Sequence, residues 1–213
     1  MQSRMNAAID LAMTFVFLAC LSAPGYYSQA ATQDQKKPVY AELVASALKG
    51  DPNVDYTAMR YASLDAPKNK KAVYHSLAEM NAPLQQKDFK KALKMANEVL
   101  ENYFVDINAH LIAANAYRGL NQNDEAEKQI GFARSLVKSI LDSGDGETEE
   151  TAFVVISVDE EYVVLRQMGI PPSNQSLSHG KNGWYDVLKS KKDGQDVTLY
   201  FNITKFYGKE FGL

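Results

Sequence analysis

Hydrophobic residues recur at helical spacing soon after residue 38. Five of them occupy the i, i+3, i+4, i+7 and i+8 positions of one helix face: Tyr40, Leu43, Val44, Ala47 and Leu48. Gly50 and Pro52 follow directly, and both residue types are common just past a helix. The pattern therefore predicts a helix that ends at this point.

The stretch from 51 to 71 has a weaker pattern. It predicts a short helix that carries Tyr56 and Met59 behind a cap at Asp55. A solvated loop is expected from 67 to 71, and the pattern offers no reason to place chemistry in this region.

Residues 72 to 143 are helical in pattern throughout and contain an internal period. Ala92 and Ala126 lie 34 positions apart, and the second unit matches the tetratricopeptide helix-turn-helix repeat at four positions: Ala114, Tyr117, Ala126 and Ala133. The preceding unit matches only in its second half, because Pro83 lies where the first helix should carry an aromatic residue. One and a half repeats are too few to be stable alone, so these helices must pack against the rest of the chain.

The chain changes character after a turn-rich acidic link at 142–147. A strand is predicted over 151–158, and Asp159, Glu160 and Glu161 then suit the first turn of a short helix that stops at Gly169. A strand remains the alternative for that segment. Two hairpins are predicted next, one at Gly180–Gly183 and one at Lys192–Gly194, before a last strand with strict alternation of apolar and polar residues.

These elements predict an α+β fold. An N-terminal tetratricopeptide-like helical layer over 39–142 packs with a small C-terminal antiparallel sheet over 143–213, which carries one short helix. We expect the two parts to form one compact unit.

The first thirty residues predict an export signal. Arg4 precedes an apolar run of about eleven residues from Leu11 to Leu21, and Ser28 to Ala30 is a small-x-small cleavage site. The run is well short of the roughly 20 residues that span a membrane, so we expect no stable span after cleavage at Ala30. Residues 31–38 would then be a polar tether, and the protein would be periplasmic or secreted. Lipidation at Cys20 and an uncleaved anchor are the alternatives.

Composition narrows the class further. The 213 residues are 46% hydrophobic and 23% charged, which excludes disorder throughout. The net charge of −3 provides no broad positive field for nucleic acid. A single cysteine, Cys20, allows neither an internal disulfide nor a thiolate zinc site.

Catalytic and cofactor signatures were sought and none is found. The sequence has no His-Glu-x-x-His, no Gly-x-Ser-x-Gly, no phosphate-binding glycine loop and no dinucleotide fingerprint. The acidic link fails as an EF-hand, since glycines occupy two ligand positions and Phe153 lies where the bidentate glutamate belongs. We therefore predict no cofactor and no metal, and an ordinary solvated turn at the link.

Three residues are nevertheless candidates for chemistry. His110 follows Asp106 by four positions on one helix face, which would suit an oriented base or half a metal site. The favoured alternative is a core histidine tied to that carboxylate or to a backbone carbonyl. With Asp145 and Glu161, His110 would form a small-ligand or hydrolase site between helices and sheet.

A partner surface is the other candidate. Asn108, Asn115 and Arg118 fall on the helix face that tetratricopeptide arrays use for peptides. Trp184 and Tyr200 are expected to share one face of the sheet, where flat amphipathic rings suit an apolar partner or a sugar.

Several ordered motifs resemble one exported bacterial family, the domain of unknown function 4919. They are 106–110 (DINAH), 143–146 (SGDG), 150–162 (ETAFVVISVDEEY), 185–187 (YDV) and 199–203 (LYFNI). The resemblance implies a secreted or periplasmic protein with a tetratricopeptide-like helical part and a C-terminal sheet. It implies no activity, and it directs attention to 143–162 as a functional surface.

The sequence therefore favours a non-enzymatic interaction or scaffold module of the periplasm or cell surface. Its partner would be another envelope protein or a peptide. A small-ligand binder or hydrolase acting on envelope material, built on His110, Asp145 and Glu161, is the alternative. The sequence leaves the oligomeric state open.

Overall fold

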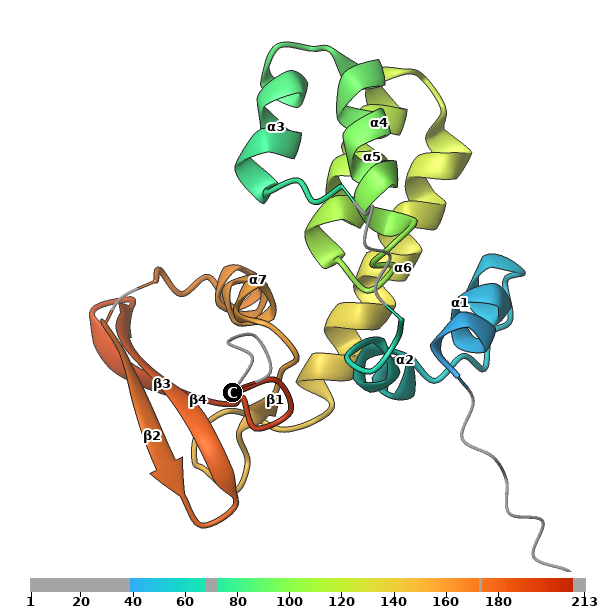
Figure 1. The fold of residues 1–213 in the computed structure, drawn as a ribbon. Helices are drawn as coiled ribbons and strands as arrows, with labels where there is room; N and C mark the ends of the chain where they lie inside the picture. Colours follow the sequence, from blue (N-terminus) through green and yellow to red (C-terminus); the bar gives the residue numbers. More distant parts are fainter. Residues whose placement is uncertain (1–38, 68–72, 173, 209–213) are drawn as a thin grey trace, which may run out of the picture. The chain divides into compact units, whose positions relative to one another are not determined.

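The computed structural model describes residues 39–67, 73–172 and 174–208 (Figure 1). Within these residues the elements in chain order are α1 (Tyr40–Leu48), α2 (Tyr56–Ser63), α3 (Leu77–Gln85), α4 (Phe89–Leu100), α5 (Ile107–Gly119), α6 (Asn123–Leu141), β1 (Phe153–Val154), α7 (Val158–Met168), β2 (Asn174–Gly180), β3 (Gly183–Lys192) and β4 (Gln195–Asn202). The fold is α+β, with the helices before the sheet, as predicted. The predicted export signal, Cys20 and the tether lie outside the described residues.

The first two helices confirm the local sequence pattern. α1 is followed by Gly50 at a φ of 79°, a left-handed conformation that favours glycine. The carboxylate of Asp55 caps α2 by accepting a hydrogen bond of 2.8 Å from the amide of Ala58.

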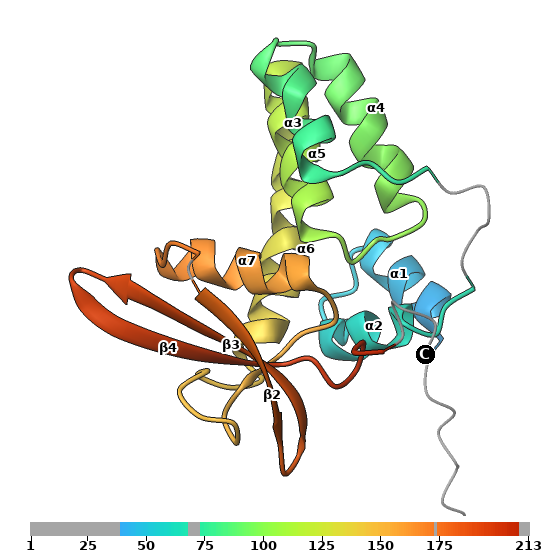
Figure 2. The same cartoon turned by 60° about the vertical axis from the view of Figure 1, so that its left-hand side comes forward.

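Helices α3 to α6 form two consecutive helical hairpins (Figure 2). Ala92 and Ala126, the residues of the 34-residue period, are fully buried, since small side chains let adjacent helices approach closely. Gly119 serves the same purpose, because a Cβ there would lie 2.4 Å from the ring of Phe89. Pro83 is buried inside α3, so the incomplete first repeat of the sequence is a complete hairpin in the structure.

The four strands form one sheet in the order β1-β4-β3-β2. Strands β2, β3 and β4 are antiparallel, and the turn at Asp193–Gly194 has positive φ at both residues, as a two-residue hairpin requires. β1 pairs with β4 in parallel, so the sheet is mixed rather than wholly antiparallel. The strand expected over 151–158 is only two residues long, because Ser157 caps α7 by accepting a hydrogen bond from the amide of Glu160.

Helix α7 packs against one face of this sheet. It ends at Gly169 in the left-handed conformation, as predicted, and its middle residues share the main hydrophobic core with alternate residues of β4. That core includes residues from α2, α6, α7 and the sheet: Met59, Leu136, Ile140, Val164, Leu165, Leu188, Leu199 and Phe201. A second cluster lies among α3, α4 and α5, so the hairpins have a small core of their own while α6 shares the main core with the sheet and α7.

Candidate functional site

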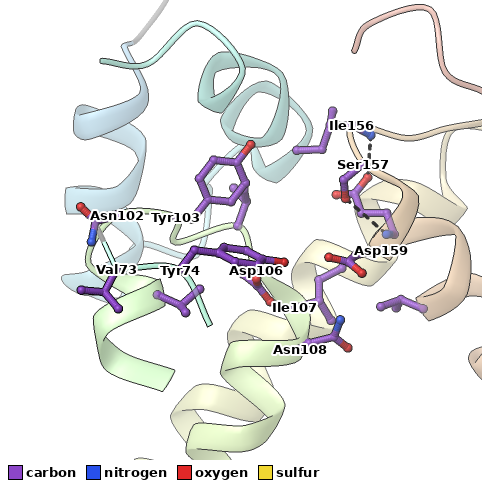
Figure 3. Close-up of a pocket in the computed structure, with 14 residues that line it drawn as sticks. Val73, Tyr74, Asn102, Tyr103, Asp106, Ile107, Asn108, Ile156, Ser157 and Asp159 are labelled. Atoms are coloured by element: carbon purple, nitrogen blue, oxygen red, sulfur yellow. Dashed lines mark hydrogen bonds between the residues drawn. The ribbon is translucent and has the colours of Figure 1, made fainter. Parts of the chain in front are cut away.

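A pocket of about 420 Å³ lies where α5 and α7 begin (Figure 3). Its walls come from the connection between α4 and α5, from the start of α7 and from the segment before α3. The lining residues are Val73, Tyr74, Val99, Asn102, Tyr103, Val105, Asp106, Ile107, Asn108, Ile156, Ser157, Asp159, Glu160 and Val163. They combine an apolar body with three carboxylates, and no lysine, arginine or histidine is among them.

Two of the three carboxylates, those of Asp106 and Asp159, lie at the starts of helices, and their negative charges repel each other. Asp106 caps α5, with Oδ1 accepting a hydrogen bond of 2.8 Å from the amide of Ala109. Burial raises the pKa of Asp106 above its ordinary value, and the nearby charge of Asp159 raises it further. Asp159 is exposed in the first turn of α7, and no hydrogen bond or ion pair to its side chain is found within the described residues.

The third carboxylate, Glu160, is neutralised by Arg60 of α2. The guanidinium Nε lies 2.7 Å from Oε1 and Nη2 lies 2.5 Å from Oε2, while Nη2 also donates to the carbonyl of Val154 at 2.8 Å. The amide of Ile156 donates to Glu160 Oε2 at 2.9 Å. Arg60 is fully buried, and its contacts join α2 to β1 and α7. Of the pair, Glu160 lines the pocket.

Sequence reasoning missed both members of this ion pair. Arg60 lies in the stretch where the pattern offered no chemistry, and Glu160 was assigned only to a helix start. The two residues are 100 positions apart, so no local spacing indicates that they meet.

His110 is sealed in the helical part with no exposed surface. Nε2 lies 2.7 Å from the carbonyl oxygen of Phe104, and Nδ1 lies 2.6 Å from the side-chain amide of Gln129. Burial lowers the pKa of His110 and favours the neutral ring, which has a single N–H to donate. Both neighbouring atoms, the carbonyl oxygen of Phe104 and Oε1 of Gln129, are acceptors, so the ring donates to one of them, and a bond to both needs the Gln129 amide turned over. It is tied to a backbone carbonyl, one of the two partners expected for a core histidine, and Asp106 instead caps the helix.

Asp145 lies in the exposed link before β1. Its side chain accepts a hydrogen bond of 2.9 Å from the amide of Glu147, and a hydrogen bond from Thr151 is the main reason that the pKa of Asp145 is lowered. Its backbone amide donates to the carbonyl of Thr151 at 3.0 Å. These bonds are those of a tight turn.

Glu161 has the most perturbed environment of the three candidates. It is fully buried beneath the sheet, and Oε1 has no hydrogen-bond partner. Burial, and then the charge of Asp186 on β3, raises the pKa of Glu161 to about 9. The side-chain amide of Gln175 on β2 donates to Asp186 at 2.6 Å and lies 3.5 Å from Glu161 Oε2.

The structure therefore does not bring His110, Asp145 and Glu161 into one site. Each has its own partners, and none of the three lines the pocket at the starts of α5 and α7. Asp186 lies beside Glu161, and both residues lie outside that pocket as well.

The three candidate partner residues of α5 differ in how far they are exposed to solvent. Asn115 and Arg118 are exposed, and Arg118 is paired with Glu127 at 2.8 Å. Asn108 is only 5% exposed, because its side-chain oxygen accepts a hydrogen bond of 2.6 Å from Arg166 of α7. Contact with α7 thus removes one end of the face that would have bound a peptide, and Asn108 lines the pocket instead.

The two aromatic candidates of the sheet lie on opposite faces, contrary to expectation. Tyr200 pairs directly with Val187, which is three positions from Trp184, and side chains alternate between faces along a strand. Trp184 stacks on Tyr207, with ring centroids 4.4 Å apart. Tyr200 packs on the other face beside Tyr185 and Val187.

Three further features of the described residues bear on function: metal ligands, membrane-spanning helices and a second hollow. No group of three or more histidine, cysteine, aspartate or glutamate side chains is arranged to hold a metal ion. None of their helices has the length and apolar character needed to cross a membrane. A second hollow of about 1140 Å³ is lined by residues of α1, of α2 and its flanking segments, and by Glu101 and Asn102 after α4. It also contains three carboxylates, those of Asp55, Asp65 and Glu101.

These features define an α+β protein of helical hairpins and a mixed sheet, with an acidic and apolar pocket at the starts of α5 and α7. The family model for a domain of unknown function (DUF4919) matches residues 56–210, which is more than half of the chain. The chain therefore belongs to this family, and the match covers every residue of the pocket. No curated protein and no solved structure matches the chain.

Proposed function

We propose that this chain is an exported, non-enzymatic protein-interaction module that holds a side chain of its partner in the pocket where α5 and α7 begin. The observation that carries the proposal is the pocket itself. Its 420 Å³ volume and branched apolar walls suit the insertion of one or two side chains. Export is supported by the signal-like first thirty residues and would place the partner in the periplasm or at the cell surface.

The arrangement of titratable groups favours binding over catalysis. A hydrolytic site needs an acid, a base or a nucleophile within reach of one substrate position. His110 is sealed from solvent, and Asp145 is held in a turn by its own neighbours. The hydrolase alternative built on these residues with Glu161 thus has no common site, and we do not propose it.

Site-specific crosslinking tests the interaction. Tyr74 lines the pocket and is 70% exposed, so a photoreactive phenylalanine derivative can replace it with little change in shape. Tyr162 on α7 is also exposed, does not line the pocket, and serves as the matched control position. We expect a defined adduct with an envelope protein from position 74 and none from position 162.

Two results would contradict the proposal. Equal adducts from both positions would mean that the pocket does not select the partner. An adduct from position 74 that survives Val163→Phe, which fills the pocket, would mean the same, provided that the variant retains the wild-type circular dichroism spectrum. Mass spectrometry of the protein from the same cells tests export, since a first residue at Ala31 is expected after cleavage and a lipidated Cys20 is not.

A further inference from the structure

The pocket carries an unbalanced negative charge. Within the described residues, only Glu160 of the three carboxylates has a cationic partner, Arg60, and no lysine, arginine or histidine lines the pocket. Asp106 and Asp159 therefore place like charges close together beside apolar walls.

The starts of α5 and α7 do not offset this charge. A helix N-terminus carries a partial positive charge on its free amides. Here the amide of Ala109 is already bound by Asp106, the amide of Glu160 by Ser157, and the amide of Ile156 by Glu160. With these donors used internally, an anionic ligand would meet carboxylates rather than open amides.

We infer that the pocket recognises an arginine side chain of the partner protein, with its guanidinium paired to Asp106 and Asp159 and its aliphatic stem against the apolar walls. This inference rests on the proposed function and adds the chemistry of the inserted group. Arginine suits two carboxylates that come from different helices, because its planar group donates in several directions at once. The rings of Tyr74 and Tyr103, which also line the pocket, are surfaces on which a guanidinium can stack.

The valine and isoleucine residues of the lining provide a direct readout. In the full chain labelled at these methyl groups, a capped arginine, N-acetyl-arginine methylamide, is titrated against two matched probes. Capped citrulline has nearly the same shape without the charge, and capped glutamate has the opposite charge. We expect arginine to shift the methyl signals of Val99, Ile107, Ile156 and Val163. The affinity for citrulline should be roughly three- to tenfold weaker, and added salt should reduce the difference.

Charge-removing variants locate the interaction. Asp106→Asn and Asp159→Asn should each weaken arginine binding about threefold or more and leave citrulline binding unchanged, since asparagine also caps helices. Asp88→Asn is the matched control for Asp106, because Asp88 caps α4 in the same way. Asp124→Asn is the control for Asp159, because both are the second residue of a helix. Neither control should change arginine binding.

A last variant tests whether lysines of the chain itself neutralise the carboxylates of the pocket. Lys68, Lys70 and Lys71 precede Val73 in the sequence and lie outside the described residues. In the triple alanine variant we expect arginine binding to stay within about twofold of wild type. A tenfold gain would show that these lysines already neutralise the carboxylates, and it would overturn the inference.

Other results separate this inference from the proposed function. Equal binding of arginine, citrulline and glutamate, or arginine binding that is insensitive to both aspartate variants, would overturn the charge recognition alone. Crosslinking from position 74 would then still support a pocket that binds its partner without charge selection. Failure of pocket-specific crosslinking while the arginine probe binds as expected would instead contradict a protein partner.

Discussion

Glu160 and Glu161 are neighbours in the first turn of α7 and differ sharply in how their burial is compensated. Glu160 lies against α2 and accepts hydrogen bonds from Arg60 and from the amide of Ile156. Glu161 lies against the sheet, beside another carboxyl group at Asp186, and one of its oxygens has no partner. The same residue type thus forms an ionic anchor on one side of the helix and a protonated acid on the other, because the neighbouring elements supply different groups.

Removing Arg60, the cation that pairs with Glu160, should have the largest effect on the free energy of unfolding. Arg60→Met would leave the carboxylate of Glu160 buried without its cationic partner, which typically costs about 3–5 kcal/mol. Chemical denaturation at pH 7 measures the loss in the free energy of unfolding. The double variant Arg60→Met/Glu160→Gln should recover part of it, because the neutral amide still accepts from Ile156. A loss below about 1 kcal/mol in the single variant would show that Glu160 is not held by the ion pair.

Glu161→Gln should act in the opposite direction and depend on pH. The pKa of Glu161 is raised from an ordinary value of 4.5 to about 9 in the folded state. A raised pKa means that the folded state binds the proton more tightly than the unfolded state. The stability it provides is therefore complete below pH 4.5 and declines as the pH rises toward 9.

We therefore expect Glu161→Gln to stabilise the protein at pH 8 by about 1–3 kcal/mol and to have little effect at pH 4.5. Urea denaturation of wild type and variant across this range checks the result. Glu160→Gln is the neighbouring control and should destabilise the protein at pH 8. A variant curve that runs parallel to wild type at all pH values would contradict the assigned proton.

The smallest effect is expected at Gln175, whose amide donates to Asp186 and lies near Glu161. Gln175→Ala should reduce the free energy of unfolding by about 0.5–1.5 kcal/mol, because water replaces the donor only in part at this exposed position. The loss should be greater at pH 9 than at pH 5, since Glu161 is partly ionised near its pKa of about 9 and then depends more on the donor. Ser176→Ala, on the same strand, should show no such pH dependence.

Sequence patterns predicted those features that depend on residues a few positions apart. The end of α1 at Gly50, the cap at Asp55, the hairpin turn at Asp193–Gly194 and the alternation along β4 all agree with the structure. The 34-residue period was also visible, because Ala92 and Ala126 fill equivalent close contacts between helices.

The candidate site was much less predictable. His110, Asp145 and Glu161 are the residue types of a catalytic site, yet each is held by separate partners. Asp106 was considered as a partner of His110 and Asp159 was assigned to a helix start, and nothing in their spacing shows that the two helix starts meet at one pocket.

The sequence by itself determined the α+β order of elements and some of their ends, since helix periodicity, caps and turns arise from contacts within a few residues. The tertiary structure alone decided which carboxylate is neutralised, which is protonated and which faces a pocket. Those outcomes depend on Arg60, Asp186 and the start of α5, all distant in sequence from α7. Burial and charge act through space, so their effect on Glu160 and Glu161 is fixed only when the chain has folded.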